Sequence, residues 1–255
     1  MDALEALTKI ANANTVDSVM ATVAIDSGPY VPPLTCSEYL WLEIKKLGLP
    51  ALGTDTVYEA IPEGALVDLQ KEVADKFQAV LAALLIDTEN DHNSKDTANR
   101  WAKMMITELY RGRYFPPPAI TEFPNVTQID EMYVVGPITI RSVCAHHMVP
   151  ITGHAWVGVI AKDALIGLSK FHRSIDHISS RPQIQEEWAM RIADFLEDCT
   201  QPEGLAVLIR AKHLCCSHRG VKDPDSLMVN SVTRGAMRNN AMARAEFFQL
   251  VELSR

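Results

Sequence analysis

The stretch Ile138-Thr139-Ile140-Arg141-Ser142-Val143-Cys144, followed by Ala145-His146-His147, decides how the chain is organised. Ile138, Ile140 and Ser142 alternate with three other side chains, and this period of two predicts a β-strand that ends at Cys144. The turn after it holds one thiol and two imidazoles in four positions. Cys144 and His147 have a C-x₂-H spacing, which lets both reach one metal ion. Thiolate and imidazole are ligands that zinc prefers.

A second strand end carries the same residue types far downstream. The β-rich run 205–211 leads into His213-Leu214-Cys215-Cys216, and the run 154–161 predicts the hairpin partner of the first strand. If the two strand ends meet, Cys144, His147 and Cys215 would bind zinc and leave a fourth position open for water, as in a catalytic site. His146 and His213 would then be available for acid–base work. The alternative is a closed structural zinc site with His146 or Cys216 as fourth ligand.

Length and composition describe an ordinary globular protein. The 255 residues allow one large domain, with or without an N-terminal extension, and 47% of them are hydrophobic. Five cysteines are too few for a disulfide framework, and the N-terminus lacks the basic start of a secretory signal. We therefore expect a cytoplasmic protein without a membrane partner. The net charge of −8 argues against nucleic acid as a partner.

The chain divides into an N-terminal extension of unknown role, residues 1–62, and a domain from 63 to 255. Within that domain we expect a helical part, 63–112, and a sheet-containing core, 126–255. Arg100 does not fit the apolar face of its helix, so its side chain is expected to point away from the core, with solvation as the default. Apolar periodicity predicts helices over 37–47, 63–86, 96–112, 169–178, 182–199 and 243–253. A further strand is expected over 227–233.

Two helix starts carry groups suited to a nucleotide. Ser169 is expected to cap a helix whose first turn holds Lys170 and Arg173, an arrangement that fits either a phosphate or plain solvent. Pro182 is expected in the first turn of the next helix, with Gln185 and Glu186 off its core face. Their amide and carboxylate suit the edge of a planar base, but such a pair is usually solvated surface.

From about Leu84 to its C-terminus the chain resembles the zinc-dependent GTP cyclohydrolase I family. Five motifs carry the resemblance, in the same order and at matching separations: Cys144-Ala145-His146-His147, Gly167-Leu168-Ser169-Lys170 with Arg173, Gln183-Ile184-Gln185-Glu186, His213-Leu214-Cys215, and Arg219-Gly220-Val221. The resemblance implies the α+β tunnelling fold, an antiparallel sheet with two helices packed on one face. It also implies a ring-forming homo-oligomer, usually a decamer of two pentamers with shared active sites.

The implied reaction converts GTP and water to 7,8-dihydroneopterin triphosphate and formate. By resemblance, Cys144, His147 and Cys215 would bind zinc, and His146 and His213 would transfer protons. Ser169 would assist the ribose rearrangement. The resemblance assigns the base to Glu186 with Gln185, and the triphosphate to Lys170, Arg173, Arg219 and Arg100, with Arg100 reaching across a subunit interface.

The chain departs from the family pattern at the metal site and nearby. Ala145 replaces the usual Glu, and Cys216-Ser217-His218 follows the ligand cysteine. The strand that usually reads Lys-Thr-Val-Thr-Ser is Leu227-Met228-Val229-Asn230-Ser231. A divergent branch is implied, whose product would serve pterin and folate synthesis or 7-deazaguanine synthesis. The alternative is a non-catalytic or altered-specificity ring protein that binds purine nucleotides.

Overall fold

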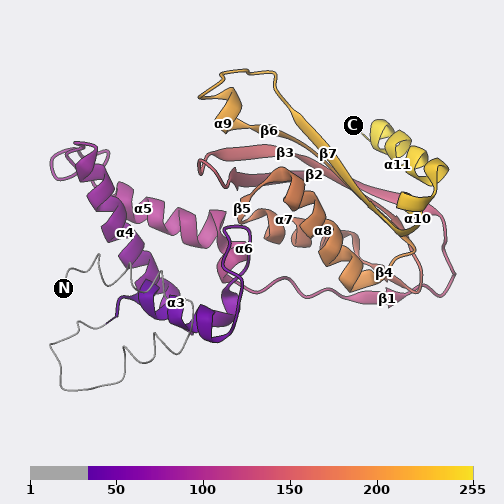
Figure 1. The fold of residues 1–255 in the computed structure, drawn as a ribbon, viewed down its shortest axis with the longest axis horizontal. Coiled ribbons are helices and arrows are strands. Elements are labelled where there is room, and N and C mark those ends of the chain that lie inside the picture. The colour runs from indigo at the N-terminus through magenta and orange to yellow at the C-terminus, as the bar shows by residue number, and fades with distance from the viewer. Residues whose placement is uncertain (1–33, 255) are drawn as a thin grey trace. The chain divides into compact units, whose positions relative to one another are not determined.

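The structure, a computed structural model, describes residues 34–254 and separates them into two compact units (Figure 1). The first comprises the described residues up to 50 together with 59–99, and the second comprises 51–58 together with residues from 100 onward. Residues 1–33 of the predicted N-terminal extension lie outside the description. No helix within the described residues combines the length and apolar character needed to cross a membrane.

The first unit is built on two helices, α3 (Cys36–Lys46) and α4 (Ala65–Ala83), which confirms both predicted helices. Thr35 and Glu38 form a reciprocal capping box at the start of α3. The hydroxyl of Ser37 donates to the Glu72 carboxylate over 2.6 Å, so α3 is hydrogen-bonded to α4. A single turn of 3₁₀ helix, η1 (Tyr58–Ala60), precedes α4.

The predicted helix 96–112 is divided into three segments. These are α5 (Thr97–Lys103), a π-helical turn η2 (Met104–Leu109) and α6 (Arg111–Tyr114). A Cβ on Gly112 would lie 1.9 Å from the backbone oxygen of His177, so only glycine allows α6 to lie this close to the backbone of His177. The uniform apolar spacing of the sequence did not reveal the π-helical turn.

The second unit contains a five-stranded sheet in the order β5-β2-β3-β6-β7. Neighbouring strands are antiparallel except for the short parallel pair β2–β5. The strands are β2 (Met132–Cys144), β3 (Pro150–Ile160), β5 (Pro182–Gln183), β6 (Gly204–His213) and β7 (Met228–Arg234). A separate two-stranded sheet pairs β1 (Glu122–Pro124) with β4 (Ala164–Ile166). The predicted hairpin of the first two long strands is confirmed.

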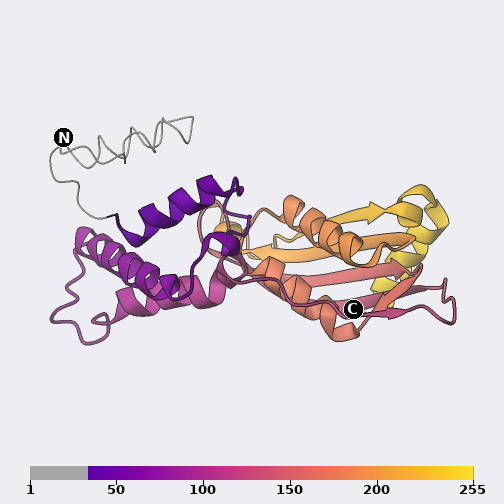
Figure 2. The same ribbon diagram turned by 90° about the horizontal axis from the view of Figure 1, so that it is seen from below.

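One face of the sheet is covered by α7 (Leu168–Ser179) and α8 (Gln185–Thr200), which lie side by side over the strands (Figure 2). Ile175, Trp188 and Ile192 are fully buried in this core. Their strand partners follow the period of two, and include Ile138, Ile140, Ile151, Ala155, Val157, Leu205, Val207 and Ile209. An α+β fold with two helices on one face of a largely antiparallel sheet is therefore confirmed.

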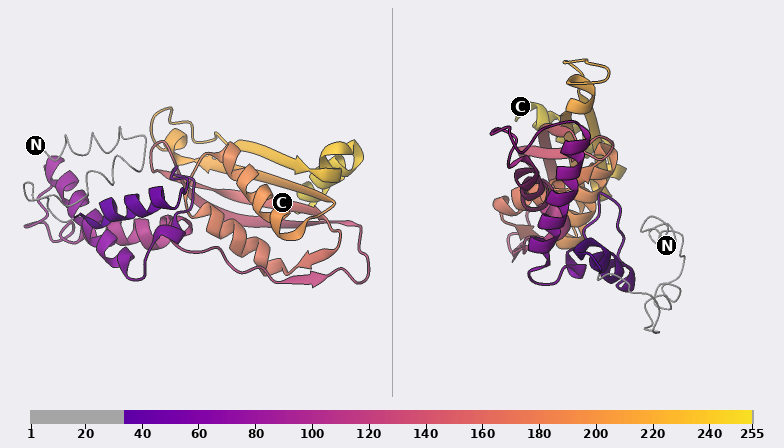
Figure 3. Two further views of the ribbon diagram at one scale, coloured as in Figure 1. Left: turned by 60° about the horizontal axis from the view of Figure 1, so that its bottom comes forward. Right: turned by 90° about the vertical axis from the view of Figure 1, so that its left-hand side faces the viewer.

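The opposite face is also covered at one end, by α10 (Gly235–Asn239) and α11 (Ala241–Leu253), shown in yellow in Figure 3. Trp156 and Leu208 point to this face and pack with Phe247 of α11. The indole nitrogen of Trp156 donates to the hydroxyl of Ser254 over 3.1 Å. The expectation of helices on one face was therefore incomplete, because apolar side chains at alternate positions of β3 and β6 form a second, smaller core.

Two helix starts differ from the sequence prediction. Gly167 is the residue before the first turn of α7, so Ser169 lies inside that turn and does not cap it. Pro182 does not begin α8. It pairs with Val143 as part of β5, and α8 begins at Gln185. Pairing with the edge of β2 outweighed the preference of proline for a first helical turn.

The segment 51–58 belongs to the sheet-containing unit. Arg191 of α8 contacts the Asp55 carboxylate at 3.1 Å, and the backbone N–H of Val57 donates to the carbonyl of Arg113 over 2.8 Å. Asp55 is buried, and arginine side chains are the partners that make burial of such a charge tolerable.

Candidate metal centre and active site

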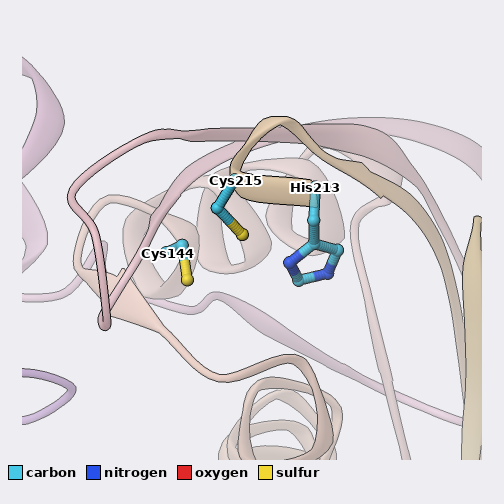
Figure 4. A group of neighbouring side chains, drawn as sticks. All are labelled: Cys144, His213 and Cys215. Carbon is cyan, nitrogen blue, oxygen red and sulfur yellow. The ribbon is translucent and has the colours of Figure 1, made fainter. Parts of the chain in front are cut away.

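Two strand ends meet at the candidate site. Pro150 of β3 pairs with Val143 of β2, and the next residue, Ile151, pairs with His213 of β6, so β3 holds the two ends in register. Cys144 lies at the end of β2, and Cys215 lies in the short helix α9 (Leu214–Ser217) directly after His213. One potential ligand atom from each of these three residues lies within 4.8 Å of the other two (Figure 4).

Burial keeps the Cys215 thiol of this cluster protonated. Cys144 and Cys215 are 4% and 8% exposed. Burial is the main factor that raises the pKa of Cys215, to about 11, and the neighbouring thiols of Cys144 and Cys216 add to the effect. The Cys215 thiol is therefore neutral at pH 7 in the absence of a cation. Binding of a divalent ion would have to release that proton.

The imidazole of His213 is oriented by a buried amide. Its Nε2 lies 2.7 Å from Oε1 of Gln185, and Figure 4 shows the other ring nitrogen directed toward the cysteine side of the cluster. Burial lowers the pKa of His213, against a smaller opposite effect of Glu186. The imidazole is therefore neutral at pH 7, and it can accept a proton or a metal on the nitrogen that faces the thiols.

The turn after β2 presents its imidazoles differently. His146 and His147 are both exposed, and Nδ1 of His146 lies 3.7 Å from Sγ of Cys144. The backbone N–H of Met148 donates to the carbonyl of Cys144 over 2.8 Å, and Ala145 donates to the carbonyl of Gln183 over 3.0 Å. These bonds fix the backbone of the turn. The structure does not bring His147, the predicted third ligand, into the three-residue cluster.

Gln185 and Glu186 lie in the first turn of α8 as predicted, but only Glu186 is exposed. Gln185 is 1% exposed, which corrects the prediction that both residues lie off the core face. The N-terminal end of α8 is inserted beside β6 and β7, so its first side chain points into the protein. The amide of Gln185 is occupied by hydrogen bonds within the fold.

The predicted phosphate-binding groups lie outside the thiol cluster. Lys170 is in the first turn of α7, where its ammonium donates to the carbonyl of Ala119 over 2.7 Å. Ser169, Arg173 and Arg219 are exposed. Arg100 is an exposed residue of α5. The structure therefore places Ser169, Arg173, Arg219 and Arg100 at the surface, whereas Lys170 is half-buried.

Sequence reasoning missed Asn230, a half-buried residue of β7. Asn230 is the register partner of Ile209 on β6, the strand that ends at His213. Its side chain accepts a hydrogen bond from the Gln185 amide over 3.0 Å. Nothing in the sequence near Asn230 marks it, because its role depends on Gln185 pointing inward.

The donor set fits zinc. Two thiols and an imidazole within one 4.8 Å cluster are the ligand types and the spacing that a tetrahedral zinc site requires. Such a site can do hydrolytic chemistry, since three protein ligands leave room for water.

Comparison with known proteins agrees with this geometry. The family model described as GTP cyclohydrolase I matches residues 73–252. A protein of Chromohalobacter salexigens named GTP cyclohydrolase 1 is 34% identical over 193 residues, which cover 72% of this chain and 99% of that protein. A protein of the same name from Pectobacterium carotovorum subsp. carotovorum is 35% identical over 192 residues, covering 74% and 87% of the two chains.

Among solved structures, the archaeosine synthase QueF-Like in the apo form aligns with 47% of this chain and 97% of its own. The sequence identity is 13% and the TM-score is 0.32, so the alignment carries no weight for the fold.

Proposed function

This chain belongs to the GTP cyclohydrolase I family and is a GTP cyclohydrolase, and from that premise we propose that it uses zinc to convert GTP and water to 7,8-dihydroneopterin triphosphate and formate. The observation that supports the zinc chemistry is the convergence of Cys144 and Cys215, from two strand ends far apart in the sequence, on one imidazole. The product would enter pterin and folate synthesis or 7-deazaguanine synthesis.

Cys144, His147 and Cys215 are the proposed zinc ligands. Cys144 ends β2 and Cys215 closely follows β6, so both thiols already lie in the cluster. His147 lies on an exposed turn, from which its side chain can rotate toward an ion. Zinc bound there would supply an activated water for hydrolysis of the imidazole ring of guanine. A second candidate for the third ligand is His213, because the structure places it in the cluster.

The neutral imidazole of His213 is suited to take a proton during ring opening, since its free nitrogen faces the site. His146, which lies on the exposed turn beside Cys144, is the proposed second proton carrier. Ser169 is the proposed group for the later ribose rearrangement. It lies in the first turn of α7, one residue before Lys170.

Substrate binding is proposed for groups outside the thiol cluster. The carboxylate of Glu186 can accept two N–H groups from the pyrimidine edge of guanine, and the inward position of Gln185 leaves this task chiefly to Glu186. The proposed triphosphate ligands are cationic side chains from three regions of the chain: Lys170, Arg173, Arg219 and Arg100. Arg100 would act at a neighbouring subunit's site.

A ring-forming assembly, a decamer of two pentamers, is supported by the sheet edges. Within residues 34–254, β7 has a strand neighbour on one side only, and β2 is paired on its outer side only at Val143 and Cys144. Each edge presents unpaired N–H and C=O groups, which favours pairing between copies of the chain. Light scattering of the purified protein should give the mass of a closed oligomer; a monomer at micromolar concentration would contradict the ring.

The reaction is tested by incubating the zinc-loaded protein with GTP. We expect formate, a fluorescent pterin after oxidation, and the mass of dihydroneopterin triphosphate, with Cys215→Ser as the inactive control. GTP binding without turnover by the zinc-loaded protein would refute the proposal and favour a non-catalytic nucleotide-binding ring. A product of different mass would indicate that the reaction stops at ring opening.

A further inference from the structure

The side chain of Gln185 lies between β7 and His213. Its Nε2 donates to the carbonyl of Met228 and to Oδ1 of Asn230, both over 3.0 Å, and its Oε1 faces Nε2 of His213 at 2.7 Å. The carbonyl of Ile209 lies 3.4 Å from the same Nε2. The amide nitrogen is therefore surrounded by oxygen atoms, and the amide oxygen is directed at the imidazole.

Asn230 also contacts Gln185 through a second bond. Its Nδ2 donates to the backbone carbonyl of Gln185 over 3.3 Å. Because Nδ2 is committed to that carbonyl, Oδ1 of Asn230 must face the Gln185 side chain. A flipped Gln185 amide would place its oxygen against Oδ1 and against the carbonyl of Met228, and unpaired acceptors of this kind are costly in a buried position. The pair therefore has one favourable orientation.

That orientation fixes the proton on His213. Oε1 of Gln185 can only accept a hydrogen bond, so Nε2 of His213 must donate, and Nδ1 of a neutral ring then carries the lone pair. The nitrogen with the lone pair is the one directed at Cys144 and Cys215 in Figure 4. A ring of the opposite tautomer would point a proton at the thiols.

We propose that Asn230 is a positioning residue: through Gln185 it holds His213 as the Nε2–H tautomer, with the Nδ1 lone pair directed at the thiols of Cys144 and Cys215. This role rests on the proposed function, in which His213 accepts a proton.

The proposal predicts a loss in turnover rather than in substrate binding. Without the Asn230 side chain the Gln185 amide loses one of the groups that oppose its flip, and His213 divides between two tautomers. Removal of groups that orient an active imidazole typically costs about 10- to 100-fold in activity or metal affinity. We expect kcat of Asn230→Ala to fall about tenfold while KM for GTP stays within about twofold.

Solid-state ¹⁵N NMR of full-length protein with ring-labelled histidine tests the tautomer directly, without GTP. The His213 signals are identified by their absence in His213→Asn. Wild type should show a protonated Nε2 and a bare Nδ1. Asn230→Ala should show both tautomers. Asn230→Asp keeps an acceptor for the Gln185 amide and should restore the wild-type pattern. Val229→Ala, on the same strand, is the matched control and should change nothing.

Two results would overturn the proposal. The first is a wild-type His213 with its proton on Nδ1, which is decisive even if Asn230→Ala does not fold. The second is a folded Asn230→Ala with a single wild-type tautomer and unchanged kcat. Failure of the proposed function is a separate outcome: a tautomer that responds to Asn230 in a protein that does not turn over GTP would leave the relay intact and refute the reaction.

Discussion

The ends of β2 and β6 carry the same residue types but hold them in different ways. After β2, His146 and His147 are exposed, and backbone hydrogen bonds hold the turn. After β6, Cys215 is buried and His213 is hydrogen-bonded to a buried amide. One end is therefore preorganised before any ligand arrives, and the other can adjust its side chains. We infer that a fixed end suits proton transfer, and an adjustable end suits metal capture.

The largest effect is expected from substitution of the two cysteines, one from each strand end, that lie together in the cluster. Cys144→Ser and Cys215→Ser should each abolish zinc binding, and activity should fall at least about 100-fold, because a neutral hydroxyl is a poor zinc ligand. Zinc content by mass spectrometry of the native protein and GTP turnover measure the two effects. A serine variant with a full complement of zinc would place the metal elsewhere.

The next prediction compares the exposed imidazole of His147 with the half-buried imidazole of His213. His147→Ala should lower zinc affinity about 10- to 100-fold or more, whereas His213→Ala should retain zinc and lose turnover. Competition with a chelator gives the affinities. The reverse result would make His213 the third ligand, in line with its place in the cluster, and would leave the exposed turn without a role in metal capture.

A third imidazole shows what burial does without a partner such as Gln185. His177 of α7 is 5% exposed, and its Nε2 has no hydrogen-bond partner within the described residues. Burial is the main cause that lowers the pKa of His177 to about 4, followed by the charges of Arg181 and Arg111. The unfolded chain, with a histidine pKa of about 6.5, therefore binds the proton more readily than the folded protein does.

Stability should accordingly fall as the pH drops from about 7 toward about 4, and the decline should level off below the folded pKa. We expect His177 to account for about 1 to 2 kcal/mol of the loss in unfolding free energy between pH 7 and pH 5. Denaturant unfolding of wild type and His177→Gln at both pH values measures the difference. Equal pH dependence in the two proteins would show that His177 charges freely in the folded state.

The smallest effect is expected at Cys216, the exposed thiol next to the buried one. Cys216→Ser should leave zinc content unchanged and activity within about twofold, as for other exposed substitutions. This variant addresses the alternative of a closed four-ligand zinc site. A clear loss of zinc would make Cys216 the fourth ligand and exclude an open position for water.

The sheet and the convergence of the cysteines were predictable because they depend on simple periodicity. Alternation in 138–143 and the apolar run 205–211 placed two strands correctly, and each strand end carried its cluster. The inward position of Gln185 was not predictable. It depends on Pro182 joining β5 and shifting the start of α8, a tertiary pairing that overrides the local preference of proline.

Asn230 was missed for a related reason. Its importance lies in the register Ile209↔Asn230, which sets the side chain opposite β6 and within reach of α8. A one-residue shift of β7 would turn Asn230 to the other face, and sequence patterns define register poorly on a half-exposed edge strand. The predicted phosphate-binding groups pose a different problem, because Arg100 is proposed to act at a neighbouring subunit's site, and a sequence alone does not define that interface.

The register of β3 between β2 and β6 also has a consequence for how the protein matures in the cell. Cys144, His213 and Cys215 become neighbours only after strands from distant parts of the chain have paired, and such long-range pairings form slowly. Zinc would therefore bind only after the sheet has formed. An ion that binds the folded chain alone stabilises it against unfolding by mass action. A cell short of zinc would then lose the protein itself, through turnover of unfolded chains, as well as its activity.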